Sequence, residues 1–199
     1  MLYIESLSNP VLKVCDIEAM AAIARAHDLL LVIDNTFTTP WGCQPIEMGC
    51  DLIIHSTTKY LGGHSDIVGG AVVGRKDLIA ELFPKKVHFG GAPDPHACYL
   101  LERGMRTLSA RMPIHCSNAA EIAKRLEAHP RISSVIHTSL TSHPDYETAQ
   151  RTMPKGTGML AFVVDGGDEA ALSFMRGLKI IFEATSLGGV ESLIECPFN

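Results

Sequence analysis

Two short stretches of the sequence carry side chains whose chemistries complement one another around one small planar molecule. Asp34 lies in Val-Ile-Asp-Asn-Thr, and Lys59 lies in His-Ser-Thr-Thr-Lys-Tyr. A carboxylate can keep a pyridine nitrogen protonated, and a lysine amine can form an imine with an aldehyde. The hydroxyls of Ser56 and Thr58, close before the lysine, can donate hydrogen bonds to phosphate oxygens. Pyridoxal phosphate (PLP) carries all three groups, so we expect it as the cofactor, held by Lys59 as a Schiff base.

Each of these residues alone also has an ordinary structural explanation. Asp34 is compatible with a helix cap, and Lys59 with a solvated surface side chain. That explanation gives no reason for the loop Tyr-Leu-Gly-Gly-His, which places two adjacent glycines beside the lysine. The functional hypothesis therefore depends on the residues taken together.

The elements that must position these side chains alternate between strands and helices. Short apolar runs predict four strands, and an alanine-rich stretch capped by Asp16 predicts a helix, with these bounds: strands 2–5, 29–33, 51–55 and 67–73, helix 17–27. This alternation predicts an α/β fold with a mostly parallel sheet, right-handed crossovers and flanking helices. Ligands of such sheets bind beyond the carboxyl ends of the strands, where Asp34 and the turn 56–59 both emerge.

The pattern changes near Asp94. Long helices are predicted between residues 96 and 129, with interruptions near Gly104 and at Met112-Pro113. Strands and helices then alternate in an α+β pattern: strand 132–137, helix 145–152, strand 158–165, helix 169–178. We therefore expect three parts, namely a cofactor-binding domain (1–95), linking long helices (96–130) and a small C-terminal α+β domain (131–199).

Composition and charge exclude several classes of function. The chain has 199 residues and a formal net charge of −5, and no long basic cluster points to a nucleic-acid partner. It shows no signal peptide and no apolar run long enough to span a bilayer, so we expect a soluble, cytoplasmic protein without membrane contact. The six cysteines form no Cys-x-x-Cys, and the nine histidines form no pair with metal-ligand spacing. We expect reduced cysteines and no metal site.

Three segments together resemble the Cys/Met-metabolism (transsulfuration) family of PLP enzymes. They are Val32–Thr36, Ser56–Asp66 and Ser186–Ser192, and the resemblance extends from Glu5 to the last residues. This family includes cystathionine γ-synthase, cystathionine γ- and β-lyases, methionine γ-lyase and the O-acylhomoserine sulfhydrylases. The resemblance implies the type I, aminotransferase-like PLP fold, present here in incomplete form.

The resemblance also implies a role for each matching residue. Lys59 would form the Schiff base and later move protons between substrate carbons. Asp34 would pair with the pyridinium nitrogen, while Ser56 and Thr58 would bind the phosphate.

Two further residues are implied to contact the substrate. Asn9 would lie near the ring hydroxyl and the substrate carboxylate, and Ser186 would lie beside Lys59 and the substrate. Ordinary alternatives are a simple turn at Asn9-Pro10 and a loop that needs positive φ at the glycines after Ser186.

The family's chains are longer than this one. The resemblance implies an earlier segment with a ring-stacking tyrosine, a phosphate loop and a Tyr/Arg pair that reaches the neighbouring subunit. It also implies an arginine beyond Asn199 that clamps the substrate carboxylate. We therefore expect a fragment of a homo-oligomeric enzyme, a dimer or a tetramer.

The expected function is PLP-dependent chemistry on a small sulfur-containing or O-acylated amino acid, by C–S elimination or by γ-replacement. Cystathionine-specific members often carry an acid immediately before the position of Ser186, where this chain has Thr185, with Glu183 two residues earlier. Homocysteine, methionine or an O-acylhomoserine therefore stay open as substrates. A catalytically silent scaffold is the alternative from another class. An aminotransferase fits the Asp/Lys pair but fits the context of Lys59 and Ser186 poorly.

Overall fold

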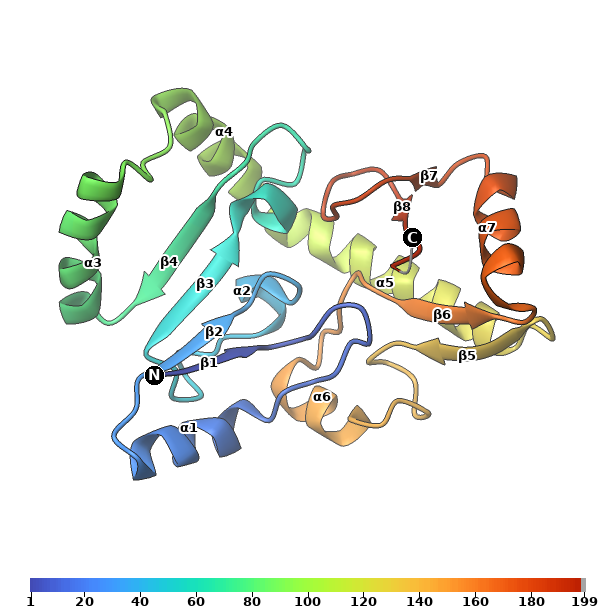
Figure 1. Cartoon of the computed structure of the whole chain (residues 1–199), viewed down its shortest axis with the longest axis horizontal. Helices are drawn as coiled ribbons and strands as arrows, with labels where there is room; N and C mark the ends of the chain where they lie inside the picture. The colour runs from blue at the N-terminus through green and yellow to red at the C-terminus, as the bar shows by residue number, and fades with distance from the viewer. Residues whose placement is uncertain (198–199) are drawn as a thin grey trace.

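A computed structural model describes residues 1–197, and a four-stranded sheet forms the centre of its larger part (Figure 1). The strands lie in the order β1 (Leu2–Glu5), β2 (Leu31–Asp34), β3 (Leu52–Ser56), β4 (Gly70–Gly74). The first three run parallel, and β4 pairs antiparallel with β3. The expected α/β class with a mostly parallel sheet is confirmed, and β4 is the antiparallel strand within it.

Helix α1 (Ile17–Ala26) packs against one face of this sheet. It begins after Asp16, whose Oδ1 accepts a hydrogen bond from Ala19 N at 3.2 Å, so the predicted cap is confirmed. The apolar side chains of α1 recur at helical spacing and point toward the strands. Helix and sheet together build the main core, which includes Ile17, Ala21, Ala24, Leu31, Ile33 and Ile53.

Two predicted strands of this sheet begin at least two residues later than expected. β2 starts at Leu31 rather than residue 29, because Leu29 and Leu30 precede the sheet and lie exposed. β4 starts at Gly70 rather than residue 67, and Val68 before it is 87% exposed. Short helical turns follow two of the strands: α2 (Thr39–Gly42) after β2, and the π-helical turn η1 (Thr57–Leu61) after β3.

Three helices connect the sheet to the rest of the molecule. α3 (Lys76–Phe89) was not predicted, whereas α4 (Pro95–Met105) and α5 (Leu108–Glu127) match the expected long helices and the break after Gly104. The predicted break at Met112-Pro113 is wrong, since α5 continues through Pro113. The proline removes only the hydrogen bond to the exposed Ser109, while the fully buried Met112 anchors the helix.

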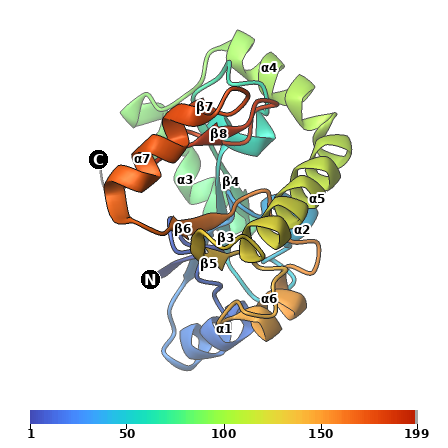
Figure 2. The same ribbon diagram turned by 90° about the vertical axis from the view of Figure 1, so that its right-hand side faces the viewer.

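The C-terminal part is smaller and mixed in structure. Its elements are β5 (Ile132–Ile136), α6 (Tyr146–Thr152), β6 (Ala161–Val164), α7 (Gly167–Gly177), β7 (Phe182–Glu183) and β8 (Leu193–Ile194). β5 and β6 pair antiparallel, and β7 and β8 form a short parallel pair. α5 runs along the molecule from the sheet toward β5, as Figure 2 shows.

Helix α6 lies far along the chain but packs into the core of the first part. Ala149 and Met153, both buried, belong to the same apolar cluster as the central strands. Arg151 Nη2 forms an ion pair with Asp16 Oδ2 at 2.6 Å, and His143 Nε2 lies 3.1 Å from Leu12 O. The division at residues 95 and 130 stays a prediction, and these contacts join its first and last parts closely.

Residues 1–197 can be searched for membrane-spanning helices and for metal sites. None of the helices in that range combines the length and apolar character needed to cross a bilayer. The same range holds no group of three or more His, Cys, Asp or Glu side chains placed to bind a metal ion.

Candidate active site

Lys59 lies at the carboxyl end of β3, in the turn η1. Its backbone departs from helical geometry (φ −94°, ψ −135°), which produces a kink at the lysine. The side chain is half-buried, and its Nζ donates a hydrogen bond to Ser186 Oγ at 2.8 Å. These two residues are 127 positions apart in sequence, so the fold brings together the two motifs that the sequence singled out.

The segment after Ser186 approaches the lysine backbone more closely than any residue with a side chain could. A Cβ at Gly188 would lie 2.4 Å from Tyr60 N and 2.7 Å from Lys59 C. Gly188 also has a φ of +85°, a conformation that glycine adopts at little cost. The glycines of this motif therefore serve close packing against the lysine turn, and positive φ is one part of the reason.

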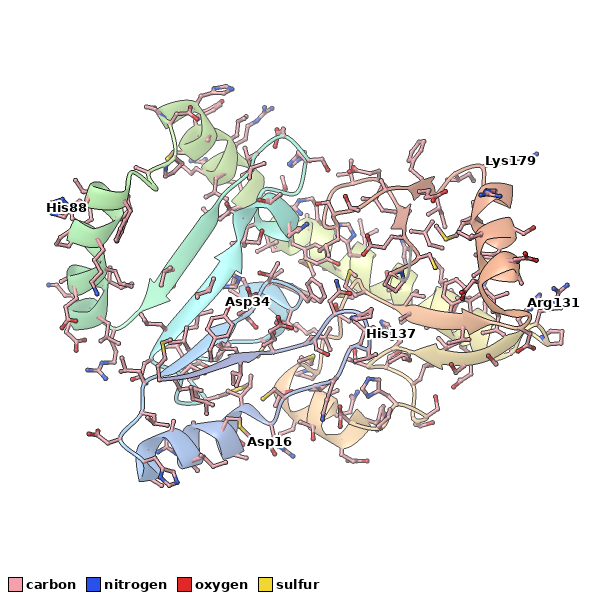
Figure 3. All side chains as sticks on the ribbon, viewed as in Figure 1. Asp16, Asp34, His88, Arg131, His137 and Lys179 are labelled. Atoms are coloured by element: carbon pink, nitrogen blue, oxygen red, sulfur yellow. The ribbon has the colours of Figure 1, made fainter. Side chains whose placement is uncertain are left out.

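Asp34, labelled in Figure 3, is the last residue of β2, and Lys59 follows the same end of the neighbouring parallel strand β3. Asp34 Oδ1 accepts a hydrogen bond from Thr36 N at 2.9 Å. Thr36 Oγ1 in turn accepts from Ser56 N at 2.8 Å, so the ends of β2 and β3 are tied together. This chain of contacts fixes the Asp34 carboxylate relative to the segment that carries Ser56 and Lys59.

Two aromatic rings near Asp34 were not picked out from the sequence. Burial, followed by the nearby Asp34 and Glu5 carboxylates, raises the pKa of Tyr3. Burial lowers the pKa of His55, and the Asp34 carboxylate opposes that shift. His55 Nδ1 is buried and has no partner among residues 1–197. Spacing could not have revealed either neighbour, because both depend on how β1 and β3 pair with β2.

The remaining predicted residues have separate environments. Thr58 Oγ1 accepts a hydrogen bond from Gly69 N at 3.0 Å, while Ser56 is half-buried at the end of β3. Asn9 is exposed in the loop that follows β1, and its peptide bond to Pro10 is cis. Because β1 runs parallel to β2, that loop leaves the sheet at the edge where Asp34 lies.

The residues at this edge fit PLP. An amine, a carboxylate and two hydroxyls stand at the ends of neighbouring strands, where a planar ring with an aldehyde, a pyridine nitrogen and a phosphate would meet them. The Lys59 amine is bonded to the neutral hydroxyl of Ser186. No ion pair ties up that amine among residues 1–197, which leaves it available for a carbonyl carbon.

A family model described as "Cys/Met metabolism PLP-dependent enzyme" matches residues 1–199, the whole chain. The chain belongs to this family. The resemblance drawn from the three motifs is thereby confirmed, and with it the expectation of PLP as the cofactor.

Relatives in this family are similar along almost all of the chain. A cystathionine β-lyase of Lactococcus lactis subsp. cremoris is 45% identical over 197 residues, which are 98% of this chain and 52% of the relative. An L-methionine γ-lyase of Pseudomonas deceptionensis is 45% identical over 200 residues, 99% of this chain and 50% of the relative. The chain therefore spans about half the length of the curated relatives it matches.

Solved structures agree with this assignment. A cystathionine γ-synthase from Xanthomonas oryzae pv. oryzae, solved with aminoacrylate and cysteine, has a TM-score of 0.96 and 40% identity. The match covers 98% of this chain and 51% of that one. The PLP-enzyme fold expected from the sequence, present in incomplete form, is confirmed.

Proposed function

We propose that the protein is a PLP-dependent enzyme acting on sulfur-containing or O-acylated amino acids. It would cleave a C–S bond by β- or γ-elimination, or replace the γ-substituent. The observation that carries this proposal is the Lys59 Nζ–Ser186 Oγ hydrogen bond of 2.8 Å beside Asp34 at the neighbouring strand end. Relatives named as cystathionine and methionine lyases and as a cystathionine synthase support the reaction class.

The cofactor would be held by residues at the ends of β2 and β3. Asp34 would bond to the pyridine nitrogen, while Ser56 and Thr58 would donate to the phosphate. When bound, PLP supplies a protonated ring that accepts the electron pair left on a substrate carbon. Asp34 is suited to keep that ring protonated, because Thr36 N already fixes one of its oxygens and thus its orientation.

Proton movement would fall to Lys59. The free amine of Lys59 would take the Cα proton of the substrate and move protons between substrate carbons. Ser186 Oγ, 2.8 Å away, orients that amine. Asn9, in the loop at the same edge of the sheet, would bind the substrate carboxylate.

The residue before Ser186 bears on the choice of substrate. Thr185 is exposed and uncharged, so it cannot hold the distal ammonium of cystathionine by charge, and Glu183 lies two residues earlier at the end of β7. We infer that homocysteine, methionine or an O-acylhomoserine competes with cystathionine at this site.

We also infer that the protein acts as a homo-oligomer, a dimer or a tetramer. Exposed apolar side chains such as Phe83 (61%) and Phe89 (88%) support association. Location in the cytoplasm stays a prediction. The same exposed surface, together with the half-length match, favours a second candidate, a PLP-type scaffold that is silent by itself.

Borohydride reduction of the loaded protein, followed by peptide mapping, tests the proposal. A pyridoxyl adduct on Lys59 is expected, and an adduct only on Lys85 or Lys86 would overturn it. Release of ammonia and 2-oxo acid from cystathionine, homocysteine and methionine then identifies the substrate. A colourless protein without an adduct would favour the scaffold. The 199-residue chain alone is expected to turn over slowly and to associate, which light scattering would detect.

A further inference from the structure

The loop that carries Ser186 makes a second side-chain contact with the lysine region, besides the Lys59–Ser186 hydrogen bond. We call residues 184–192, between β7 and β8, the Ser186 loop, and residues 62–65 the glycine turn. Ser65 Oγ, in the glycine turn, donates to Glu191 Oε1 at 2.5 Å. The two residues are 126 positions apart, so this contact joins the stretch just after Lys59 to the return of the Ser186 loop.

The glycine turn and the Ser186 loop each contain a serine in a costly backbone conformation. Ser65 has a φ of +57° and Ser186 a φ of +84°, a region that residues with a Cβ rarely adopt. Such conformations persist when surrounding contacts determine them, and they gather at functional sites. The Ser65–Glu191 hydrogen bond is one contact that fixes the first of them.

The glycine turn is backed by an arginine on its other side. A Cβ at Gly63 would lie 2.3 Å from Arg111 Cζ, so the guanidinium packs directly on the turn. Arg111 is itself fixed, because it donates to Gly104 O and to Thr107 Oγ1, both at 2.9 Å. The turn therefore has little room to shift, and a weakened Ser65–Glu191 contact should release the Ser186 loop.

The Ser186 loop has few other anchors near its second half. Leu187 packs against the cluster of Tyr60, Met112 and Cys116, and Gly188 lies on the Lys59 backbone. These contacts hold the middle of the loop. β7 and β8 contribute only two residues each, and backbone hydrogen bonds from Phe182 N to Ser192 O and from Ala184 N to Ile194 O, both at 3.1 Å, hold the ends of the loop. Between Gly188 and these ends, the Glu191 side chain ties the loop to the glycine turn.

We propose that Ser65 and Glu191 are positioning residues that hold the Ser186 loop against Lys59. They touch neither reacting atom, and they act through the 2.8 Å contact between Lys59 Nζ and Ser186 Oγ. This inference rests on the proposed function, because holding the Ser186 loop in place matters for catalysis only if Ser186 orients the Lys59 amine.

The test uses hydrogen–deuterium exchange in the full-length, cofactor-loaded protein. Ser65→Ala and Glu191→Gln each weaken the hydrogen bond, and we expect protection of the Ser186 loop amides to fall about three- to tenfold. Ser65→Gly removes the hydroxyl while relieving the positive φ, and it should lose protection like Ser65→Ala. Ser65→Asn tolerates positive φ and supplies a new donor, so it should restore protection. Matched controls are Ser192→Ala in the same loop and Glu81→Gln on α3.

A second measurement links the loop to the lysine. The kcat of Ser65→Ala and Glu191→Gln should fall several-fold while borohydride still places the adduct on Lys59. Unchanged loop protection in both variants, with the adduct present, would overturn the positioning role and leave the proposed function intact. Wild-type protection in Ser65→Gly would also overturn it, since backbone strain and not the hydroxyl would then matter. A wild-type protein without an adduct on Lys59 would overturn both proposals.

Discussion

The turn that carries Lys59 and the helix α3 lie close in sequence, yet the chain packs them in opposite ways. Thr57, Tyr60 and Leu61 of the lysine turn are all buried. None of the 14 residues of α3 is buried, although the helix contains several large apolar side chains. Figure 1 shows α3 at the outer edge of the molecule beside β4, while the lysine turn faces α5 and the Ser186 loop.

The difference lies in how each region packs within residues 1–197: the lysine turn is covered by other parts of the chain, and α3 is not. The surroundings of Lys59 come from both halves of the chain, since Leu187 and Met112 pack against Tyr60. His115 adds an edge-to-face contact with the same ring, with the two centroids 5.3 Å apart. The apolar side chains of α3 meet no such cover in this range. We therefore expect the effect of a mutation to depend on how well the mutated side chain is buried, and not on how close it lies to the lysine motif in sequence.

The largest contrast is expected between two apolar truncations. Met112→Ala removes a fully buried side chain behind Tyr60 and should lower the free energy of unfolding by about 2–5 kcal/mol. Phe83→Ala on α3 removes a ring that is 61% exposed and should change it by less than about 0.5 kcal/mol. Denaturant titration of both variants decides this. Equal losses would mean that α3 is covered in solution.

The same comparison can be made with a carboxylate in each region. Asp34→Asn removes the charge proposed to keep the ring protonated, and turnover of the loaded full-length protein should fall at least about a hundredfold. Asp77→Asn, on the exposed α3, loses a surface ion pair with Arg75 and should leave turnover unchanged. Thermal unfolding serves as the control for folding. Near-normal turnover in Asp34→Asn would contradict its role.

Local patterns were enough to predict much of this molecule. The cap at Asp16 and the periodic apolar residues of α1 fixed that helix to within one residue at its end. Buried runs located β2 and β3 because these strands are covered on both sides. The motifs around Asp34 and Lys59 were found because their residue types suit one cofactor, and Ser186 was found through the resemblance to the family. The structure places all three near one edge.

The rest could not be predicted, for physical reasons. α3 buries none of its residues, follows Arg75, which makes no side-chain capping hydrogen bond, and contains Pro84, so each usual signal of a helix is weak. The contacts of Ser65 with Glu191, and of Gly63 with Arg111, join residues far apart along the chain. The two glycines beside Lys59 were a hint of close packing, but a sequence does not state which side chain comes close.

Glycine substitutions test the same comparison at a smaller scale. A Cβ at Gly104, in α4, would lie 2.2 Å from Gly62 O, so Gly104→Ala forces the lysine region apart. We expect a loss of about 1–3 kcal/mol in the free energy of unfolding. At Gly91, just after α3, an added Cβ would meet no atom within 4 Å. Gly91→Ala should therefore change the free energy of unfolding by less than about 0.5 kcal/mol. A stable Gly104→Ala protein would show that the turn can yield.

The smallest effect concerns the pH dependence of the Ser186 loop. The hydrogen bond from Ser65, more than any other cause, lowers the pKa of Glu191, and nearby His64 lowers it further. The hydrogen bond from Arg75 likewise lowers the pKa of Asp77, in the first turn of α3. A carboxyl whose pKa is lower in the folded state stabilises the fold above its unfolded pKa, and this contribution disappears as pH falls through the folded pKa.

Protection of the Ser186 loop should therefore decline as pH is lowered from about 6 to below the ordinary glutamate value of about 4.3. Exchange rates corrected for their intrinsic pH dependence measure this decline. Glu191→Gln cannot titrate, so its loop should show low protection at every pH in that range. Asp77→Asn should keep the wild-type pH profile in the loop, because the Arg75–Asp77 pair is exposed and remote. If the decline persists in Glu191→Gln, another group must titrate. The charge of Glu191 would then have no role in the positioning contact.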